Sequence, residues 1–285
     1  MPDTTEAPRP MTRPAPQPAA QAPASASRPV RFRGGGFVAE PRRWAALLAF
    51  VIAIAAWEAS GRLRLVSPLF LPPPSAILLA LQGLVADGSL ARNLAASLMR
   101  IGVGWTLGTA AGVLVGFAMG IWSIARAIGL PAVSALFPIP KIALLPLFIL
   151  WLGIGEASKF ATIGLGVFFP TVIATYSAVD GVPRNLIRMG QSFNMPWLDV
   201  LRKVVLPGAM PGILAGFRIS ASIALILVVS AEMIGADYGI GAFVLNAGNL
   251  MLTDQLLAGV LVLSLLGLAI GTALSLLEKT LLKWR

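Results

Sequence analysis

A charged interruption between two long apolar segments places the strongest limit on how this chain can fold. Residues 180–211 read DGVPRNLIRMGQSFNMPWLDVLRKVVLPGAMP and carry four basic and two acidic side chains. Hydrocarbon cannot solvate so many charges, so the interruption has to lie at or outside a bilayer surface while its neighbours cross. The chain is therefore predicted to be an all-α membrane protein.

The interruption has the pattern of two short amphipathic helices. Pro183 suits the first turn of a helix, and Leu186, Met189 and Phe193 follow it at helical spacing. A second helix is expected to follow and to end at Pro207. Each helix has an apolar face that needs a cover, which either the membrane surface or another protein would supply.

Composition agrees with a membrane protein and excludes several kinds of chemistry. Hydrophobic residues make up 57% of the 285 residues, and charged residues only 12%. The sequence has no cysteine or histidine, which excludes disulfides, thiol nucleophiles, the usual zinc sites and histidine acid–base catalysis. No catalytic constellation or metal cluster is expected. The net charge of +10 does not indicate nucleic-acid binding, because the basic residues gather at the ends of apolar segments.

Six membrane spans are predicted from the apolar segments. They cover about residues 44–60, 95–121, 130–152, 159–178, 213–235 and 255–277. The segment before them, residues 1–43, is rich in Pro, Ala and Arg and is predicted to be a disordered tail. A secretory signal is the rival reading, but the charged region is too long for one.

Five glycines in the second span recur at every fourth residue. They are Gly104, Gly108, Gly112, Gly116 and Gly120. In lipid, small residues at this spacing let helix backbones approach closely. We expect this stripe to pack tightly against another helix, within the subunit or between subunits.

Polar and proline residues inside the spans are candidates for a translocation pathway. Pro138 and Pro140 free backbone carbonyls in the third span. Lys141 beside them either attracts an anion, extends to the membrane interface, or pairs with Glu232. Glu232 is read mainly as a structural partner for a basic group or for free backbone donors. Asn246 lies in a stretch predicted to be a loop, where it either binds an oxyanion or caps a turn.

The distribution of basic residues predicts the orientation. With the N-terminus inside, seven arginines of the tail, Arg126, four residues of the interruption and three at the C-terminus are cytoplasmic, which is 15 of the 22 Lys and Arg residues. This asymmetry satisfies the positive-inside rule. Both termini and the 180–211 interruption are therefore expected in the cytoplasm.

A nucleotide-binding loop is missing from the sequence. No Gly-x-x-x-x-Gly-Lys-Ser/Thr motif occurs, so ATP is not expected to bind this chain, and an ATP-driven process would need a separate motor. The alternative is a secondary transporter without an ATPase. That class predicts an inverted repeat with a broken helix in each half, and only one strongly broken span is evident.

Three stretches resemble the permease subunits of bacterial ABC importers. They are the interruption with its DGVP start and VLPGAMPGI end, the run PIPKIALLPLFILWLGIGEASK, and SASIALILVVSAEMIGA in the fifth span. The resemblance covers about residues 44–285 and is nearest to the aliphatic sulfonate, taurine and nitrate branch. Where that family carries Glu-Ala-Ala followed four residues later by Gly, this chain has Arg188-Met189-Gly190 and Asn194.

The resemblance implies a fold, a role and partners. The fold would be the type I, methionine-importer-like permease fold, with a cytoplasmic coupling loop at residues 180–211. The chain would work as a homodimer in the bacterial inner membrane, with two ATPase subunits that hold ATP and Mg²⁺ and an outer substrate-binding protein. Substrates in related permeases include sulfonates, taurine, nitrate, bicarbonate and pyrimidine precursors. The residues expected to couple to the ATPase are Asp180, Gly181, Pro183, Leu186, Arg188, Met189, Gly190, Phe193 and Asn194.

Overall fold

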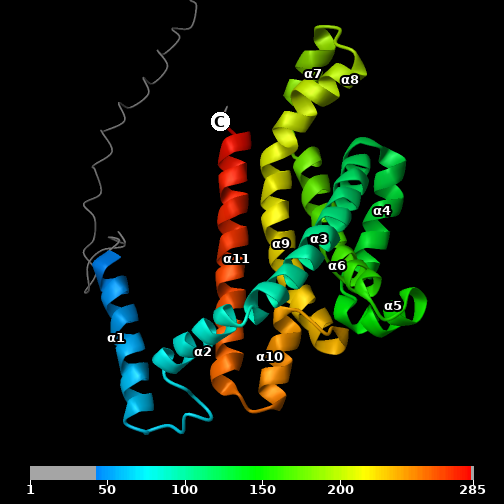
Figure 1. Ribbon diagram of the computed structural model, residues 1–285. Coiled ribbons are helices and arrows are strands. Elements are labelled where there is room, and N and C mark those ends of the chain that lie inside the picture. Colours follow the sequence, from blue (N-terminus) through cyan, green and yellow to red (C-terminus); the bar gives the residue numbers. More distant parts are fainter. Residues whose placement is uncertain (1–42, 284–285) are drawn as a thin grey trace, which may run out of the picture. The chain divides into compact units, whose positions relative to one another are not determined.

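The computed structural model describes residues 43–283, and every regular element within that range is a helix (Figure 1). The predicted tail lies outside the described residues, apart from Arg43. In chain order the elements are α1 (Arg43–Arg62), α2 (Pro74–Ala86), α3 (Ser89–Ile121), α4 (Ser123–Leu136), the 3₁₀ turn η1 (Lys141–Leu144), α5 (Leu145–Leu152), α6 (Glu156–Asp180), α7 (Arg184–Ser192), α8 (Trp197–Val200), the π turn η2 (Leu201–Val205), α9 (Leu206–Gly235), α10 (Ile240–Asn249) and α11 (Thr253–Leu281). The chain divides into two compact units, Met1–Phe50 and Val51–Arg285, and the elements from α2 onward belong to the second.

Four helices in the described range are long and apolar enough to cross a membrane. They are α3, α6, the continuous helix Trp197–Gly235, and α11. A fifth candidate is α4 together with η1 and α5, a pair bent by 87°. The all-α membrane architecture is thus confirmed, and the described range holds four to five candidate spans. The predicted first span is helical as α1 but is not among these candidates.

Helix α3 begins six residues before the predicted second span. The Asp87 side chain accepts a hydrogen bond from the Ser89 amide at 2.8 Å, and Gly88 takes a left-handed conformation just before the helix. The first turns are polar because they carry Arg92 and Asn93. Hydropathy marks where lipid begins, and a helix can extend beyond that boundary.

The predicted third span, residues 130–152, is broken into two helical segments, as its prolines suggested. Helix α4 already starts at Ser123 and ends at Leu136, and the chain turns by 87° before η1. Pro138 and Pro140 lie in this turn, where each removes an amide donor and restricts the residue before it. Pro131, in contrast, is accommodated inside α4.

The sequence predicted that the second helix of the 180–211 interruption ends at Pro207, but in the structure the helix continues past both Pro207 and Pro211. Helix α8 passes through η2 into α9 without a break, so one 39-residue helix runs from Trp197 to Gly235. Pro207 follows the π-helical turn Leu201–Val205 closely, and this irregular turn accommodates a residue that has no amide hydrogen to donate. The second half of the hairpin and the membrane helix therefore form one continuous helix.

The glycine stripe of α3 packs against α6 within this subunit. A Cβ atom at Gly104 would lie 2.7 Å from Ile163, and the contact repeats every fourth residue in both helices. The facing residues on α6 are Ile163, Val167, Thr171, Thr175 and Val179. Because both series rise together, α3 and α6 run parallel and nearly in backbone contact.

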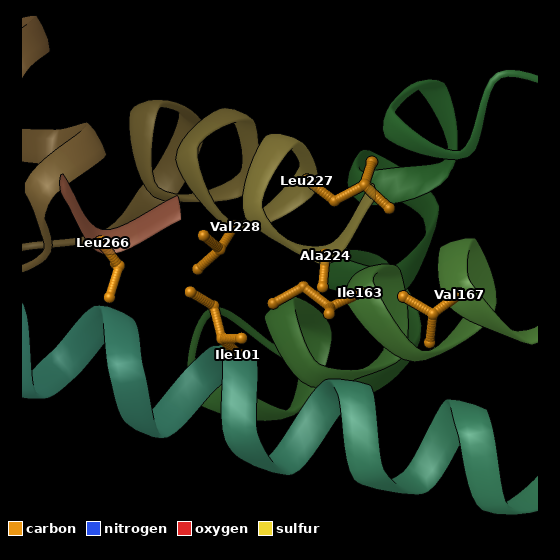
Figure 2. Close-up of a cluster of buried hydrophobic side chains, with 7 residues drawn as sticks. All are labelled: Ile101, Ile163, Val167, Ala224, Leu227, Val228 and Leu266. Carbon is orange, nitrogen blue, oxygen red and sulfur yellow. The ribbon is translucent and has the colours of Figure 1, made fainter. Parts of the chain in front are cut away.

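Helix α9 completes the core by packing antiparallel on α6. Ala174 and Ala178 of α6 face Gly216 and Gly212 of α9, respectively. Figure 2 shows where the helices meet in one apolar cluster, with side chains from α3, α6, α9 and α11 pointing inward. Its buried members are Ile101, Ile163, Val167, Ala224, Leu227, Val228 and Leu266.

Candidate functional site

The hairpin formed by α7 and α8 (residues 181–205) projects at the end of α9 opposite α10 (Figure 1). Pro183 is the N-cap residue of α7, and its extended backbone separates α7 from the end of α6. Asn194 has a φ of 54°, a left-handed conformation that lets the chain reverse between the two short helices. Proline and asparagine therefore define the two corners of the hairpin.

One side of the hairpin is anchored in a buried apolar cluster. Val182, Val200 and Val205 pack with Val179 of α6 and Ile213 of α9. All of these side chains are buried. A shift of the hairpin is therefore expected to move the ends of α6 and α9, because close-packed side chains transmit displacement.

The other side of the hairpin presents apolar side chains to the exterior. Leu186, Met189 and Phe193, the predicted apolar stripe of α7, are 41%, 54% and 75% exposed. They border a hollow of about 330 Å³, whose other walls include Met195 and Val204. An exposed apolar surface around a groove is typical of a site that binds another protein.

Asp180 ties the start of the hairpin to the α3–α4 corner. Its carboxylate accepts a hydrogen bond from Arg126 Nη2 at 2.6 Å. The same guanidinium donates to the carbonyls of Met119 and Gly120 at the end of α3, and lies 5.2 Å from the centre of the Tyr176 ring. Asp180 thus holds α4 against the end of α6.

The two departures from the importer pattern fit the backbone of the hairpin. Asn194 occupies the left-handed corner where the resemblance places Gly, and asparagine tolerates that conformation better than most residues. Gly190 is buried where the pattern has Ala, and a Cβ there would meet Met195 and Val200 at 3.5 Å, an ordinary contact. Gly181 closes α6, while Arg188 is exposed on α7.

A buried network of charges lies at the other end of the helices. Glu232, in α9, is fully buried and accepts hydrogen bonds from Ser97 Oγ, Arg100 Nη1 and the Gly241 amide at 2.8 to 3.0 Å. Gly239 folds over this carboxylate so closely that a Cβ would lie 2.3 Å from Glu232 Cδ. Glu232 has the basic partner and backbone donor expected of a structural carboxylate.

Arg100 joins this carboxylate to a second one. Its Nε and Nη2 donate to both oxygens of Glu156 at 2.7 Å, and its Nη1 also reaches the Tyr238 carbonyl. Lys159 lies 3.7 Å from Glu156 and donates to the Gly155 carbonyl. Two cations and two carboxylates balance here, which is what burial of charge requires. The network fastens the start of α10 to α3, α6 and α9.

The candidate pathway residues Lys141 and Glu232 have different partners. Lys141 does not pair with Glu232, since its Nζ donates to the carbonyls of Leu136 and Phe137 at 3.0 and 2.5 Å and lies 4.7 Å from the Phe169 ring centre. It therefore caps the C-terminal end of α4, where freed carbonyls attract a cation. Pro138 and Pro140 are exposed in the turn. Their role in transport stays a prediction.

Asn246 lies on a helix rather than in the predicted loop. Helix α10 covers most of residues 236–254 and leaves Asn246 exposed. The stretch looked like a loop because it is rich in small residues, yet Ile240, Ala242 and Ala247 bury one side of it. Tertiary packing overrides the weak local preference.

Four charged residues form ion pairs in the structure but were not among the predicted site residues. They are Arg100, Arg126, Glu156 and Lys159. A signal for the first was present, because Arg100 falls inside the predicted second span, where an ionisable residue needs a partner. Its partners come from 56 and 132 residues further along the chain. Only the folded arrangement identifies them.

The helical arrangement matches that of solved transporter permeases. A chain of the MetNI methionine ABC transporter, in an inward-facing conformation, aligns with a TM-score of 0.56 at 21% identity, covering 65% of this chain and 92% of that chain. The fold is therefore that of the type I importer permeases.

Sequence comparison identifies the family. The chain belongs to the binding-protein-dependent transport system inner membrane components, because the model of that family matches residues 108–283. It is 35% identical over 239 residues to the putative aliphatic sulfonates transport permease protein SsuC of Bacillus subtilis, covering 84% of this chain and 87% of the relative. It is 37% identical over 239 residues to the taurine transport system permease protein TauC of Escherichia coli, covering 82% and 86%. The chain is thus a multi-pass inner-membrane permease subunit of an ABC importer. This family assignment does not favour the alternative of a secondary transporter.

Proposed function

We propose that this permease couples to a separate ATPase through the exposed face of the α7–α8 hairpin. The observation that supports the proposal is the apolar stripe Leu186, Met189 and Phe193, which is exposed while the opposite side of the hairpin is buried. An apolar surface of this kind on an anchored element fits a groove on a partner protein. The chain would hold no nucleotide, and ATP with Mg²⁺ would bind to the partner.

Motion at the hairpin would reach the membrane by two routes. The first is the continuous helix from Trp197 to Gly235, and the second is the junction of Asp180 with Arg126. When two ATPase subunits close on ATP, two hairpins of a permease dimer would be drawn together. The helices would then switch between outward-facing and inward-facing arrangements, as packed interfaces tend to have two discrete states.

The substrate we propose is an aliphatic sulfonate or a related small anion such as taurine or nitrate. The names of the two relatives support this class, since both match over more than four fifths of the chain. A soluble substrate-binding protein outside the membrane would deliver the anion to a homodimer of this chain. Both termini would lie in the cytoplasm.

Charge introduced on the exposed stripe tests the coupling. In membranes that contain the ATPase and the binding protein, Leu186→Glu and Phe193→Glu should abolish ATP-driven uptake of taurine or an alkanesulfonate and release the ATPase during purification. The matched control is Leu250→Glu, because Leu250 is 69% exposed, close to the 75% of Phe193, and lies between α10 and α11. This control should keep the ATPase bound. Full uptake by both hairpin variants would refute the proposal.

A further inference from the structure

A groove between α9 and α11 has no assigned occupant. Its deeper part is a hollow of about 320 Å³ lined by Ala221, Ser222 and Leu225 of α9 and by Gly267 and Gly271 of α11. A second hollow of about 690 Å³ continues from it toward the end of α11 and shares Arg218 with the first. Together they form one channel on the outer surface of the bundle, which we call the α9–α11 groove.

The floor of the groove is open because two glycines lie in it. A Cβ atom at Gly271 would have no neighbour within 4 Å, and one at Gly267 would meet only Leu225 at 3.6 Å. These glycines are therefore unlike the five stripe glycines of α3, whose missing side chains are replaced by a packed helix. At Gly271 the space next to the helix is left for something else.

The mouth of the groove is basic. Arg218 and Lys279 line it, and Lys283 follows four residues later. Glu278 is the acid at the mouth and takes a hydrogen bond from Arg218 Nη2. The Arg218 side chain is still 50% exposed despite this contact. The mouth therefore keeps an excess of positive charge beside an apolar channel.

The length of the groove matches one leaflet of a bilayer. From Gly267 to Leu282 the helix rises about 22 Å at 1.5 Å per residue. Half of a bilayer, with its headgroup region, measures roughly 20–22 Å. An apolar channel that ends in exposed cations at headgroup depth has the polarity of a single phospholipid with a negative headgroup.

We propose that the α9–α11 groove binds one anionic phospholipid. Its phosphate would lie between Arg218 and Lys279, and an acyl chain would run along Gly271 and Gly267. Basic pockets between membrane helices on the cytoplasmic side are known to hold such headgroups. The leaflet follows from the orientation given under the proposed function, because the C-terminal end of α11, which carries Lys279, lies on the same side of the bundle as the α7–α8 hairpin (Figure 1).

The test uses the purified full-length chain in detergent, titrated with dioleoylphosphatidylglycerol or dioleoylphosphatidylcholine and followed by native mass spectrometry. We expect phosphatidylglycerol to be retained in preference to phosphatidylcholine. Gly271→Leu should abolish this preference, because the new side chain would occupy the open space where a Cβ atom meets no neighbour within 4 Å. Gly102→Leu is the matched control, since Gly102 is an exposed helical glycine of α3 with open space around it.

Charge variants should move the affinity in opposite directions. Arg218→Gln should weaken phosphatidylglycerol binding about fivefold, the effect of one basic residue near a headgroup. Glu278→Gln should tighten it by a similar factor, because the competing carboxylate is removed. Thermal unfolding without added lipid checks that every variant is folded.

Three results would overturn the proposal. They are equal retention of the two lipids, unchanged retention in Gly271→Leu, and a change in the oligomeric mass of Gly271→Leu, which would make a second protein copy the occupant. Association with the ATPase should persist in all of these variants, since none lies on the hairpin. Loss of the lipid site would therefore leave the coupling proposal intact, and the reverse also holds.

Discussion

Charged residues of this permease form two kinds of ion pair, one buried and one exposed to solvent. Glu232 has no exposed surface on its side chain and bonds to Arg100, whereas Asp199 pairs with Lys203 on the surface of the hairpin with 40% of its side chain exposed. An exposed pair contributes little because water solvates both partners. A buried ion pair stabilises the fold little more than an apolar pair of the same size would. Removing one partner, however, leaves a buried charge without a counter-charge, which is strongly destabilising.

Replacing Glu232 should therefore be far more damaging than replacing Asp199. Glu232→Ala is expected to lower the free energy of unfolding by about 3–5 kcal/mol, because Arg100 loses a buried partner. Asp199→Ala, the control, is expected to cost about 0.2–1 kcal/mol. Thermal unfolding in detergent measures both, and equal shifts would contradict the role assigned to the buried network.

The corner at Asn194 sets a conformational requirement that can be tested with two substitutions. Asn194→Gly should leave stability and ATPase binding nearly unchanged, because glycine adopts a positive φ freely. Asn194→Val should destabilise the hairpin by about 1–2 kcal/mol, the cost of a left-handed conformation for a residue with a Cβ atom. Limited proteolysis within residues 181–205 reports the local effect, and equal protection of the two variants would argue against the corner.

Among the elements, the α3–α6 pair shows how helices associate when lipid surrounds them. Hydrophobic burial gives little preference for helix over lipid, so close backbone approach and van der Waals contact have to stabilise the pair. The stripe of glycines on α3 receives branched side chains of α6 at each turn. Register between the two helices is thus fixed over the length of the contact.

Two glycine-to-alanine substitutions on α3 should change the free energy of unfolding in opposite directions. Gly108→Ala should destabilise the protein by about 1–3 kcal/mol, because its Cβ would lie 2.3 Å from the Gly164 carbonyl oxygen, a backbone atom that cannot move aside easily. Gly102→Ala should instead stabilise it by about 0.5–1 kcal/mol, as alanine favours the helix and the space is open. Unfolding in detergent compares them, and a stabilising Gly108→Ala would contradict the packing described.

At the scale of the whole molecule, the two ends of the bundle have different chemistry. The hairpin end carries exposed apolar and basic side chains, while the end at α10 carries the buried network of Arg100 and Glu232. The first suits contact with a partner and with anionic lipid, and the second holds the short α10 in place. Orientation in the membrane decides which end meets ATP.

The absence of cysteine from the sequence makes orientation directly measurable. In spheroplasts, a membrane-impermeant maleimide should label Leu250→Cys at once and Phe193→Cys only after permeabilisation. Both leucine and phenylalanine are more than two thirds exposed, so accessibility does not differ for other reasons. Immediate labelling of Phe193→Cys would place the hairpin outside and contradict the proposed coupling.

The sequence alone determined the features that follow from local chemistry. Charge density in residues 180–211 excluded the membrane interior, glycine spacing predicted close packing, and the prolines of residues 138–140 predicted a broken helix. Each of these depends on residues within a few turns of one another. Tertiary structure alone decided which helix receives the stripe, which cation Glu232 contacts, that Lys141 caps α4, and that the helix continues through Pro207. Those outcomes depend on partners that are distant in the sequence, and a pattern in one segment carries no information about the segment that folds against it.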